Sequence, residues 1–556
     1  MRFLRQHWPL ILLLIITTAL YAGSVGNGFV SLDDPLLVTE NRLVTEPSLR
    51  HVVDSFRSFD PELYVPLTFL SFQAEAWTLG MEAWHFHLLN LLLHLAAVTL
   101  VFSIVLVLTR RRDVSLLAAA LFAIHPVNAE AVLWVSSRKD VLSTVFALAS
   151  LRMFLATRAK PSRLRYVLCL VLFLFALLSK VTVLTLPLIF LLTDFYRGNS
   201  VGKKQIKEIT PFLLLSILFG VIAIVGKTHI VGREELSTLV LMAFRSTFFS
   251  LRLLLFPYGQ SAIHILHEPI GITSPLFALS IIIVTGLSLC IWRMRRRFPS
   301  VAFGWAFFLV ALAPTFLHYS RGGEDILLGS ERYLYFPFLG LSFIAAGVFV
   351  GLRESRSVTL PTRAAMGIGL AGILLGLGSL TFRQASVFRD SIAFNKNILL
   401  EEPGDARTHY NLGNSFKEAG RLREAEASYR TSLALNRTAF ALPAINLGIL
   451  LVEAGRTEEG LKMLKKATTI RPDYFRSFFN LGVAYQQLKR YDEAMDAYRK
   501  TIELFPDFPA VHHHLATVYG QKKMYREALA EFKILSDLDP GFREKLRTVA
   551  PAFVAK

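Results

Sequence analysis

Long apolar runs separated by short cationic clusters dominate the first 380 residues. A run of about 20 apolar residues is long enough to cross a bilayer as a helix. The first run follows Arg2 and Arg5 and is typical of either a signal peptide or a retained first helix, of which we expect the helix. Eleven membrane helices are predicted, at residues 8–23, 86–109, 114–135, 140–157, 165–180, 181–196, 209–227, 273–292, 300–318, 333–352 and 364–382.

The placement of Lys and Arg predicts the orientation of these helices. Cationic clusters are enriched on the cytoplasmic side of membranes, so residues 110–112, 158–165, 197–207, 293–297 and 353–363 are expected there. A further apolar run, 237–257, contains Arg245 and Arg252, and we interpret it as an amphipathic or re-entrant helix on the outer side. The number of crossings is then odd. It follows that the N-terminus is cytoplasmic and that residues after 382 lie outside.

Composition agrees with lipid as the main solvent. Apolar residues make up 53% of the 556 residues and charged residues 18%, against about a quarter in soluble domains, and mean hydropathy is +0.46. The net charge of +18 resides mainly between apolar runs, which argues against nucleic-acid binding. The two cysteines, Cys169 and Cys290, lie inside apolar runs and indicate neither a disulfide framework nor a zinc site.

The last third of the chain has an internal repeat. The triplet Asn-Leu-Gly begins at residues 411, 446 and 480, and a degenerate His-Leu-Ala begins at 514. Small residues return in step at 425, 460, 494 and 528, and prolines at 472, 506 and 540. A period of about 34 residues with small residues at helix crossings is the tetratricopeptide signature. Such repeats form a solenoid with a concave face that binds proteins or peptides, although a spacer or a folding cap is an alternative.

The predicted fold class is therefore all-α, with a polytopic transmembrane domain followed by a tetratricopeptide-repeat α-solenoid. The predicted domains are a membrane domain at 1–385 with a long first outer loop at 27–85, a linker helix at 386–405, four repeats at 406–541 and a tail at 542–556.

Two adjacent acids begin the long first loop. In FVSLDDPLLVTE, Asp33 and Asp34 have carboxylates suited to a general base and a metal ligand. Asp-Pro is equally typical of a helix N-terminus, where Asp caps and Pro occupies the first turn. Both interpretations stay open from these residues alone.

A second polar group follows the run at 114–135, in IHPVNAEAVLWVSSRKD. Arg138 and Lys139 are cations that can extend toward lipid headgroups, and Asp140 can cap the next helix. His125, before a proline, is expected to be a packed or hydrogen-bonded histidine. Glu130 is flanked by apolar residues near the membrane face, so it needs a partner.

Further cations occur at the same predicted outer edge. Lys180 lies at a turn between two runs, and Glu331 and Arg332 begin another. Lone cations at membrane edges usually contact lipid headgroups. Several of them facing one acidic pair are instead typical of an enzyme that handles a membrane-anchored phosphate.

These segments resemble a known family. The family is that of the C-type glycosyltransferases, and the chain most closely resembles the transmembrane and tetratricopeptide-repeat O-mannosyltransferases and their prokaryotic relatives. The resemblance is carried by the terminal repeats and by the strings LDDP, YVPLTFLSF, FHLLNLLLH, LFAIHPVNAEAVLWVSSRKDVLS, LLSKVTVLTLP and ERYLYFPFLG. Two departures are Lys139, where S-x-R-A-D would have a small residue, and Val181-Thr182, where many relatives have an acid after the Lys.

The resemblance implies a sugar donor linked to polyprenyl phosphate and an acceptor site on the outer side. Repeats on that same side favour a protein hydroxyl over a glycolipid as the acceptor. Carried over by position, the resemblance implies catalytic carboxylates at Asp33, Asp34 and Glu130, with Asp33 or Asp34 as the base, and phosphate ligands at Arg138, Lys180 and Arg332. Attack of the acceptor oxygen opposite the phosphate would invert the anomeric carbon. His125, Asp140 and Glu331 have supporting roles. A divalent cation on Asp34 and Glu130 is left open.

Two other classes of function remain as alternatives. One is a membrane-anchored scaffold without chemistry, and the other is a transporter or lipid flippase. The expected location is a bacterial inner membrane with periplasmic repeats, on the basis of the prokaryotic relatives and the missing C-terminal retention tetrapeptide. A lumenal placement in a eukaryotic reticulum is the alternative.

Overall fold

The computed structural model describes residues 2–57, 59, 64–200, 202–226, 236–317, 326–435, 440–539 and 541. The predicted tail at 542–556 and Pro540 lie outside these residues. The chain forms two compact units, Met1–Glu402 and Pro403–Lys556. Both are almost entirely helical, which confirms the predicted fold class.

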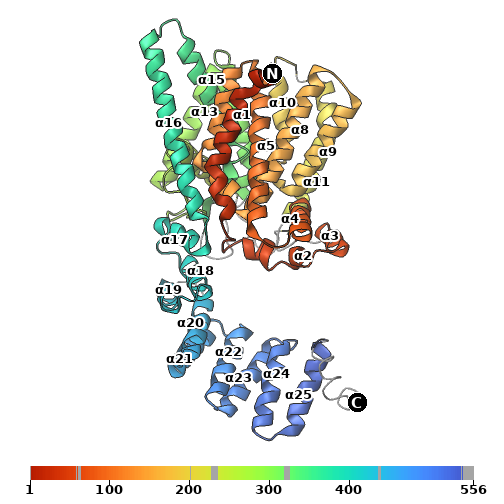
Figure 1. Cartoon of the computed structure of the whole chain (residues 1–556), viewed down its shortest axis with the longest axis vertical. Coiled ribbons are helices and arrows are strands. Elements are labelled where there is room, and N and C mark those ends of the chain that lie inside the picture. Colours follow the sequence, from red (N-terminus) through yellow and green to blue (C-terminus); the bar gives the residue numbers. More distant parts are fainter. Residues whose placement is uncertain are drawn as a thin grey trace. The chain divides into compact units, whose positions relative to one another are not determined.

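Unit 1 is a bundle of long helices that run side by side (Figure 1). The N-terminus lies at one end of this bundle, and α2, α3 and α4 lie at the other. The long helices are α1 (Arg2–Tyr21), α5 (Ala83–Thr109), α6 (Arg112–Ile124), α8 (Arg138–Ala159), α9 (Arg163–Ser179), α10 (Leu186–Tyr196), α11 (Lys203–Gly226), α12 (Leu236–Leu255), α13 (Pro275–Met294), α14 (Pro299–Leu312), α15 (Phe338–Glu354) and α16 (Leu360–Val387).

Short elements connect the long helices at the end of the bundle that holds α2 to α4. They are η1 (Ala22–Gly26), η2 (Pro35–Thr39), α2 (Arg42–Thr45), α3 (Leu49–Ser55), α4 (Pro66–Leu79), η3 (Pro126–Asn128), α7 (Ala129–Leu133), η4 (Val135–Ser137), η5 (Val181–Val183), η6 (Ala313–Leu317), η7 (Glu331–Leu334) and α17 (Ser391–Glu401). Strands β1 (His264–Ile265) and β2 (Leu327–Gly329) form a small antiparallel pair. These breaks bring polar backbone and side chains together at one end of an otherwise apolar bundle.

Within the described residues, eight helices are long and apolar enough to cross a membrane, or nine if the bent pair α6 and α7 is one span. Three of the eleven predicted segments hold shorter helices, α9 and α15 with 17 residues each and α10 with 11. Polar Lys180 and Arg332 and the prolines at 187 and 337 interrupt these runs, which is why the helices are short. Length and apolarity also make α12 a candidate span, so its interfacial interpretation stays a prediction.

Unit 2 contains four helical hairpins, as the repeat period predicted. Gly413, Gly448 and Gly482 lie where the first helix of a hairpin meets the second, and a Cβ on any of them would fall within 2.6 Å of Tyr429, Leu464 or Tyr498. Glycine in each Asn-Leu-Gly triplet therefore permits close helix packing. The hairpins are α18 (Ala406–Glu418) with α19 (Leu422–Leu435), α20 (Leu442–Glu453) with α21 (Thr457–Ile470), α22 (Phe475–Gln487) with α23 (Tyr491–Leu504), and α24 (Pro509–Gln521) with α25 (Tyr525–Leu538).

Close packing of α14 on α15 places η7, the turn that precedes α15, and it gives a testable prediction. A Cβ at Gly340 would collide with the carbonyl oxygen of Gly304 and lie 2.9 Å from the backbone nitrogen of Phe308. Gly340→Ala should therefore lower the free energy of unfolding by about 1–3 kcal/mol, seen as a lower melting temperature in detergent. Gly347→Ala on the same helix is the control, because nothing lies within 4 Å of that position. Equal melting temperatures for the two variants would contradict this packing.

Candidate functional site

The two predicted loop acids point to different partners. Asp34 is buried, and its carboxylate accepts hydrogen bonds from the backbone N–H of Val30 at 2.9 Å and of Ser136 at 2.9 Å, and from the Ser136 hydroxyl. It occupies the N-cap position of η2 but makes no side-chain cap. Asp34 thus ties the loop after α1 to η4, and the capping interpretation fails because those two contacts use its oxygens.

Asp33 faces cations. Its Oδ2 lies 3.3 Å from Lys139 Nζ and 3.8 Å from Arg332 Nη2, and 28% of its side chain is exposed. The preceding residue, Leu32, has a φ of 98°, a conformation that is strained for a residue with a bulky side chain. The strained turn is held by the Asp34 contacts on its C-terminal side. Asp33 is therefore an accessible carboxylate in a fixed place.

Glu130 on α7 fixes Arg332 on η7, 202 residues away in the sequence. Arg332 Nη1 donates to Glu130 Oε1 at 3.1 Å, and the Arg332 backbone N–H and the Ser330 hydroxyl also donate to the same carboxylate at 2.9 Å. Glu130 is 2% exposed. Because removing one partner of a buried pair leaves an uncompensated charge, these contacts define the position of the guanidinium.

Arg332 also lies over the Trp134 ring, with Cζ 4.5 Å from the ring centroid. Its Nε has no hydrogen-bond acceptor among the residues that the structure describes. A planar guanidinium held on an aromatic face with a free donor is well suited to a phosphate oxygen.

Lys180 and Asp140 form the other side of the cluster. Lys180 Nζ is 2.5 Å from Asp140 Oδ1 and 5.0 Å from the centroid of the Tyr333 ring, and both charged side chains are buried. Asp140 lies in the first turn of α8 without capping it, since the cap position is Ser137. Its expected capping role is replaced by this ion pair.

Arg138 lies apart from this group. Its side chain is fully buried, with Nε donating to Asn90 Oδ1 at 2.8 Å, Nη2 donating to the Phe86 carbonyl at 2.7 Å, and Nη1 paired with Glu75. It packs 4.6 Å from the Phe72 ring centroid. Because these partners occupy each of its nitrogens, we remove Arg138 from the predicted phosphate ligands.

His125 and Glu331 support the surrounding structure. His125 Nδ1 accepts from the backbone N–H of Val127, and Nε2 lies 3.1 Å from the Leu254 carbonyl, as expected for a hydrogen-bonded histidine. Glu331 turns away from Arg332, accepts from the backbone N–H of Ser261 at 3.1 Å and lies 3.6 Å from His264 Nε2.

The predicted metal ligands have separate partners, Asp34 with Val30 and Ser136, and Glu130 with Ser330 and Arg332. In the described part of the chain, no three His, Cys, Asp or Glu side chains are grouped as a metal site.

Burial and charge separate the acidities of the two loop acids. For Asp33, burial raises the pKa, but the nearby Lys139 and Arg332 outweigh it, and the net pKa lies below the usual value. For Asp34, burial raises the pKa to about 6, against the opposing effect of the Ser136 hydrogen bonds. Asp33 is thus the carboxylate that is ionised at neutral and mildly acidic pH.

Sequence reasoning missed several residues that hold the site. Glu75, Trp134, Ser136, Ser330 and Tyr333 were not proposed, although each contacts a predicted residue. An arginine among apolar residues needs an acidic partner if it is buried, and that signal could have led to an acid such as Glu75, but Arg138 was expected to extend toward lipid headgroups. For the serines and aromatic residues, the sequence carries no comparable signal.

The Glu75–Arg138 pair gives a second testable prediction. Glu75→Gln leaves the Arg138 guanidinium buried without its counter-charge, so the free energy of unfolding should fall by about 3–5 kcal/mol, measured by thermal unfolding in detergent. Glu82→Gln is the matched control, because Glu82 is exposed a few residues away. If Glu75→Gln kept the wild-type melting temperature but lost binding of the polyprenyl-phosphate donor, Arg138 would again count as a predicted phosphate ligand.

Several similar proteins are named protein O-mannosyl-transferases. A protein O-mannosyl-transferase of Caenorhabditis elegans, F38B6.6, is 22% identical over 453 residues, which cover 77% of this chain and 62% of that protein. TMTC3 of Homo sapiens is 32% identical over 153 residues, 26% of this chain and 16% of the relative, and Tmtc1 of Drosophila melanogaster is 36% identical over 25% of this chain and 16% of the relative. Both of these are also named protein O-mannosyl-transferases. The chain thus spans less than two thirds of the length of these relatives.

Tetratricopeptide-repeat models match residues 406–438 and 475–508. Among solved structures, the crystal structure of MamA is 24% identical with a TM-score of 0.25, covering 27% of this chain and 86% of that chain. A MamA structure from Desulfovibrio magneticus RS-1 is 20% identical with a TM-score of 0.25, covering 27% and 83%. This chain is a helical protein with tetratricopeptide repeats that is similar to protein O-mannosyl-transferases over about three quarters of its length.

Proposed function

We propose that the chain is an integral-membrane glycosyltransferase that moves a sugar, mannose or another hexose, from a polyprenyl-phosphate carrier to a protein hydroxyl. The observation that carries the proposal is the cluster of Asp33, Lys139 and Arg332, a partly exposed carboxylate next to two cations that reach it from distant segments. A carboxylate and cations at one point suit a reaction in which a proton is removed and a phosphate departs.

Asp33 is the proposed base. The proton of the acceptor hydroxyl passes to an Asp33 oxygen while the hydroxyl oxygen forms a bond to the anomeric carbon. The bond from that carbon to the carrier phosphate breaks, and its electron pair leaves with the phosphate. Attack opposite the leaving group inverts the anomeric centre. A phosphate ester is already a good leaving group, so no strong acid is required.

Arg332 and Lys139 are the proposed phosphate ligands, with Lys180 as a third cation of the same cluster. Glu130 is a positioning residue that acts through Arg332, and Asp140 acts in the same way through Lys180. The negative charge of the phosphate would compete with Asp33 for Lys139 and Arg332 and so release Asp33 toward the acceptor. The low exposure of these side chains strengthens each electrostatic contact.

The repeats are proposed to capture the acceptor protein, because stacked helical hairpins present a concave face for peptides. The proposed location is a bacterial inner membrane with the Asp33 end and the repeats on the periplasmic side, in agreement with the distribution of Lys and Arg.

Substitution of the two acids tests their division of roles. Asp33→Asn should lower transfer from a polyprenyl-phosphate-sugar donor by about 10²- to 10⁴-fold in membranes with equal amounts of folded protein. Asp34→Asn should mainly lower the melting temperature, since one amide oxygen cannot replace the carboxylate that accepts from Val30 and Ser136. Glu40→Gln, an exposed acid in the same loop, is the control. Full activity of folded Asp33→Asn would reject the base assignment.

The pH dependence of transfer distinguishes the same two acids without mutation. The lowered pKa of Asp33 keeps it ionised throughout the range above pH 5, so ionisation of Asp33 should add no inflection to the transfer rate between pH 5 and 8. Dependence on Asp34, with a pKa of about 6, would instead make the rate rise as pH increases through 6 because the base form appears there. The measurement is the transfer rate at saturating donor across this range, and a midpoint near pH 6 would contradict the role of Asp33.

A further inference from the structure

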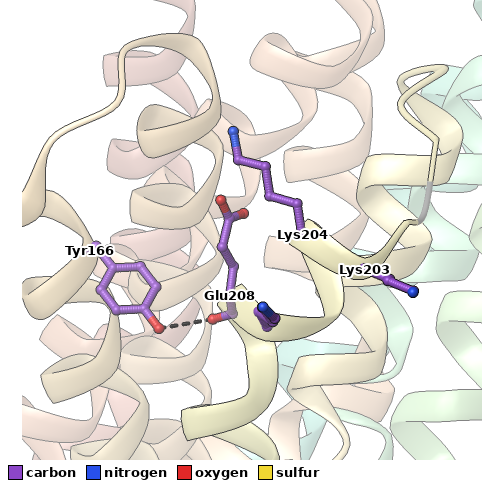
Figure 2. Close-up of a pocket in the computed structure, with 5 residues that line it drawn as sticks. Tyr166, Lys203, Lys204 and Glu208 are labelled. Carbon is purple, nitrogen blue, oxygen red and sulfur yellow. Dashed lines mark hydrogen bonds between the residues drawn. The ribbon is translucent and has the colours of Figure 1, made fainter.

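A second polar site lies at the end of the bundle opposite Asp33. A surface cavity of about 540 Å³ that is widely open to the outside is lined by Tyr166 on α9 and by Lys203, Lys204, Lys207 and Glu208 at the start of α11 (Figure 2). Lys180 directly follows the last residue of α9 and lies 14 residues after Tyr166, and a rise of 1.5 Å per helical residue separates the two by about 21 Å. The cavity is therefore distinct from the candidate site, which contains Lys180.

The acids near this cavity are bound to an arginine. The Glu208 carboxylate pairs with Arg158, and Arg158 also donates to Asp194 at 2.7 Å. The Tyr166 hydroxyl donates to the backbone oxygen of Glu208 at 2.8 Å and fixes this part of α11 against α9 (Figure 2). Arg158 neutralises one of the two negative charges of Glu208 and Asp194. The three lysines exceed the one negative charge that is left, so the cavity has a net positive charge.

The three lysines are exposed, and none has a carboxylate within 4 Å among the described residues. They occupy positions 203, 204 and 207, within the first turns of α11. The N-terminal end of a helix carries partial positive charge, which adds to theirs. The cavity is thus suited to an anion.

The walls beside the cavity are suited to hydrocarbon. Phe212 on α11 packs edge-on against Tyr166, with ring centroids 5.7 Å apart, so α9 and α11 are in contact next to a residue that lines the cavity. Both helices then present exposed apolar side chains along their length, Leu164, Val167, Leu168, Val171 and Phe175 on α9 and Leu214, Ile217, Leu218 and Val221 on α11. A free inorganic phosphate would use the lysines but not this surface.

We propose that this cavity binds the headgroup of an anionic phospholipid. Lys204 and Lys207 contact the phosphate, Lys203 lies at the rim, and the acyl chains follow the apolar faces of α9 and α11. Basic pockets between membrane helices bind anionic headgroups by the same chemistry. The proposal does not depend on the glycosyltransferase activity, because it uses the other end of the bundle.

Native mass spectrometry of the full chain tests it, with phosphatidylglycerol and phosphatidylcholine of equal acyl chains as probes. The wild-type protein should retain phosphatidylglycerol in preference to phosphatidylcholine. The triple variant Lys203→Gln, Lys204→Gln, Lys207→Gln should bind phosphatidylglycerol about 100-fold more weakly. The matched control is Arg293→Gln, Arg296→Gln, Arg297→Gln, which removes the same charge at exposed positions in the last turn of α13 and in the turn that follows it and should bind as the wild type does.

Three outcomes would overturn the proposal. Equal phosphatidylglycerol binding by the two triple variants would show that any cation at this end suffices. Equal retention of phosphatidylcholine by the wild type would remove the role of the lysines. Protection of the wild type from thermal unfolding by inorganic phosphate, without phosphatidylglycerol binding, would assign the cavity to a soluble anion.

Discussion

The ion pair between Glu130 and Arg332 is the interaction on which the candidate site depends. It joins α7 to the turn before α15, and it places a guanidinium beside Asp33 where an unpaired charge would be costly. The Ser330 hydroxyl and the Arg332 backbone N–H also donate hydrogen bonds to the Glu130 carboxylate. The helices around it supply a low-dielectric setting, so the geometry of a few polar contacts fixes the arrangement of the whole cluster.

The same helices carry polar groups at both ends and apolar side chains between them. On α8, Lys139 and Asp140 begin the helix and belong to the Asp33 cluster, whereas Arg158 ends it beside Asp194 and Glu208. A membrane helix tolerates charge at its ends, where partners and water are within reach, far better than in its middle. One set of helices therefore supports a candidate reaction site and, at the opposite end, a candidate lipid site.

Adjacent residues of like charge have different structural roles at two places in the site. Asp34 forms structural hydrogen bonds, whereas Asp33 stays accessible. Arg138 forms a structural ion pair with Glu75, whereas Lys139 faces Asp33. Asp34 is bonded to Val30 and Ser136, and Arg138 is bonded to Glu75, Asn90 and the Phe86 carbonyl. These bonds fix the backbone from which the adjacent Asp33 and Lys139 extend. The strained φ of Leu32 belongs to the same arrangement, since the contacts on either side of it hold the turn.

The sequence by itself determined the helical class, the repeats and most of the polar cluster. Apolar run length, the 34-residue period and ionisable residues at run ends are local signals with a direct physical cause. Tertiary structure decided which of two adjacent acids or cations faces the cluster, because that depends on side-chain direction and on partners such as Glu75, Trp134 and Ser136. It also decided how the cations at the run ends are compensated, since Lys180 pairs with Asp140 and Arg332 with Glu130, both distant in sequence.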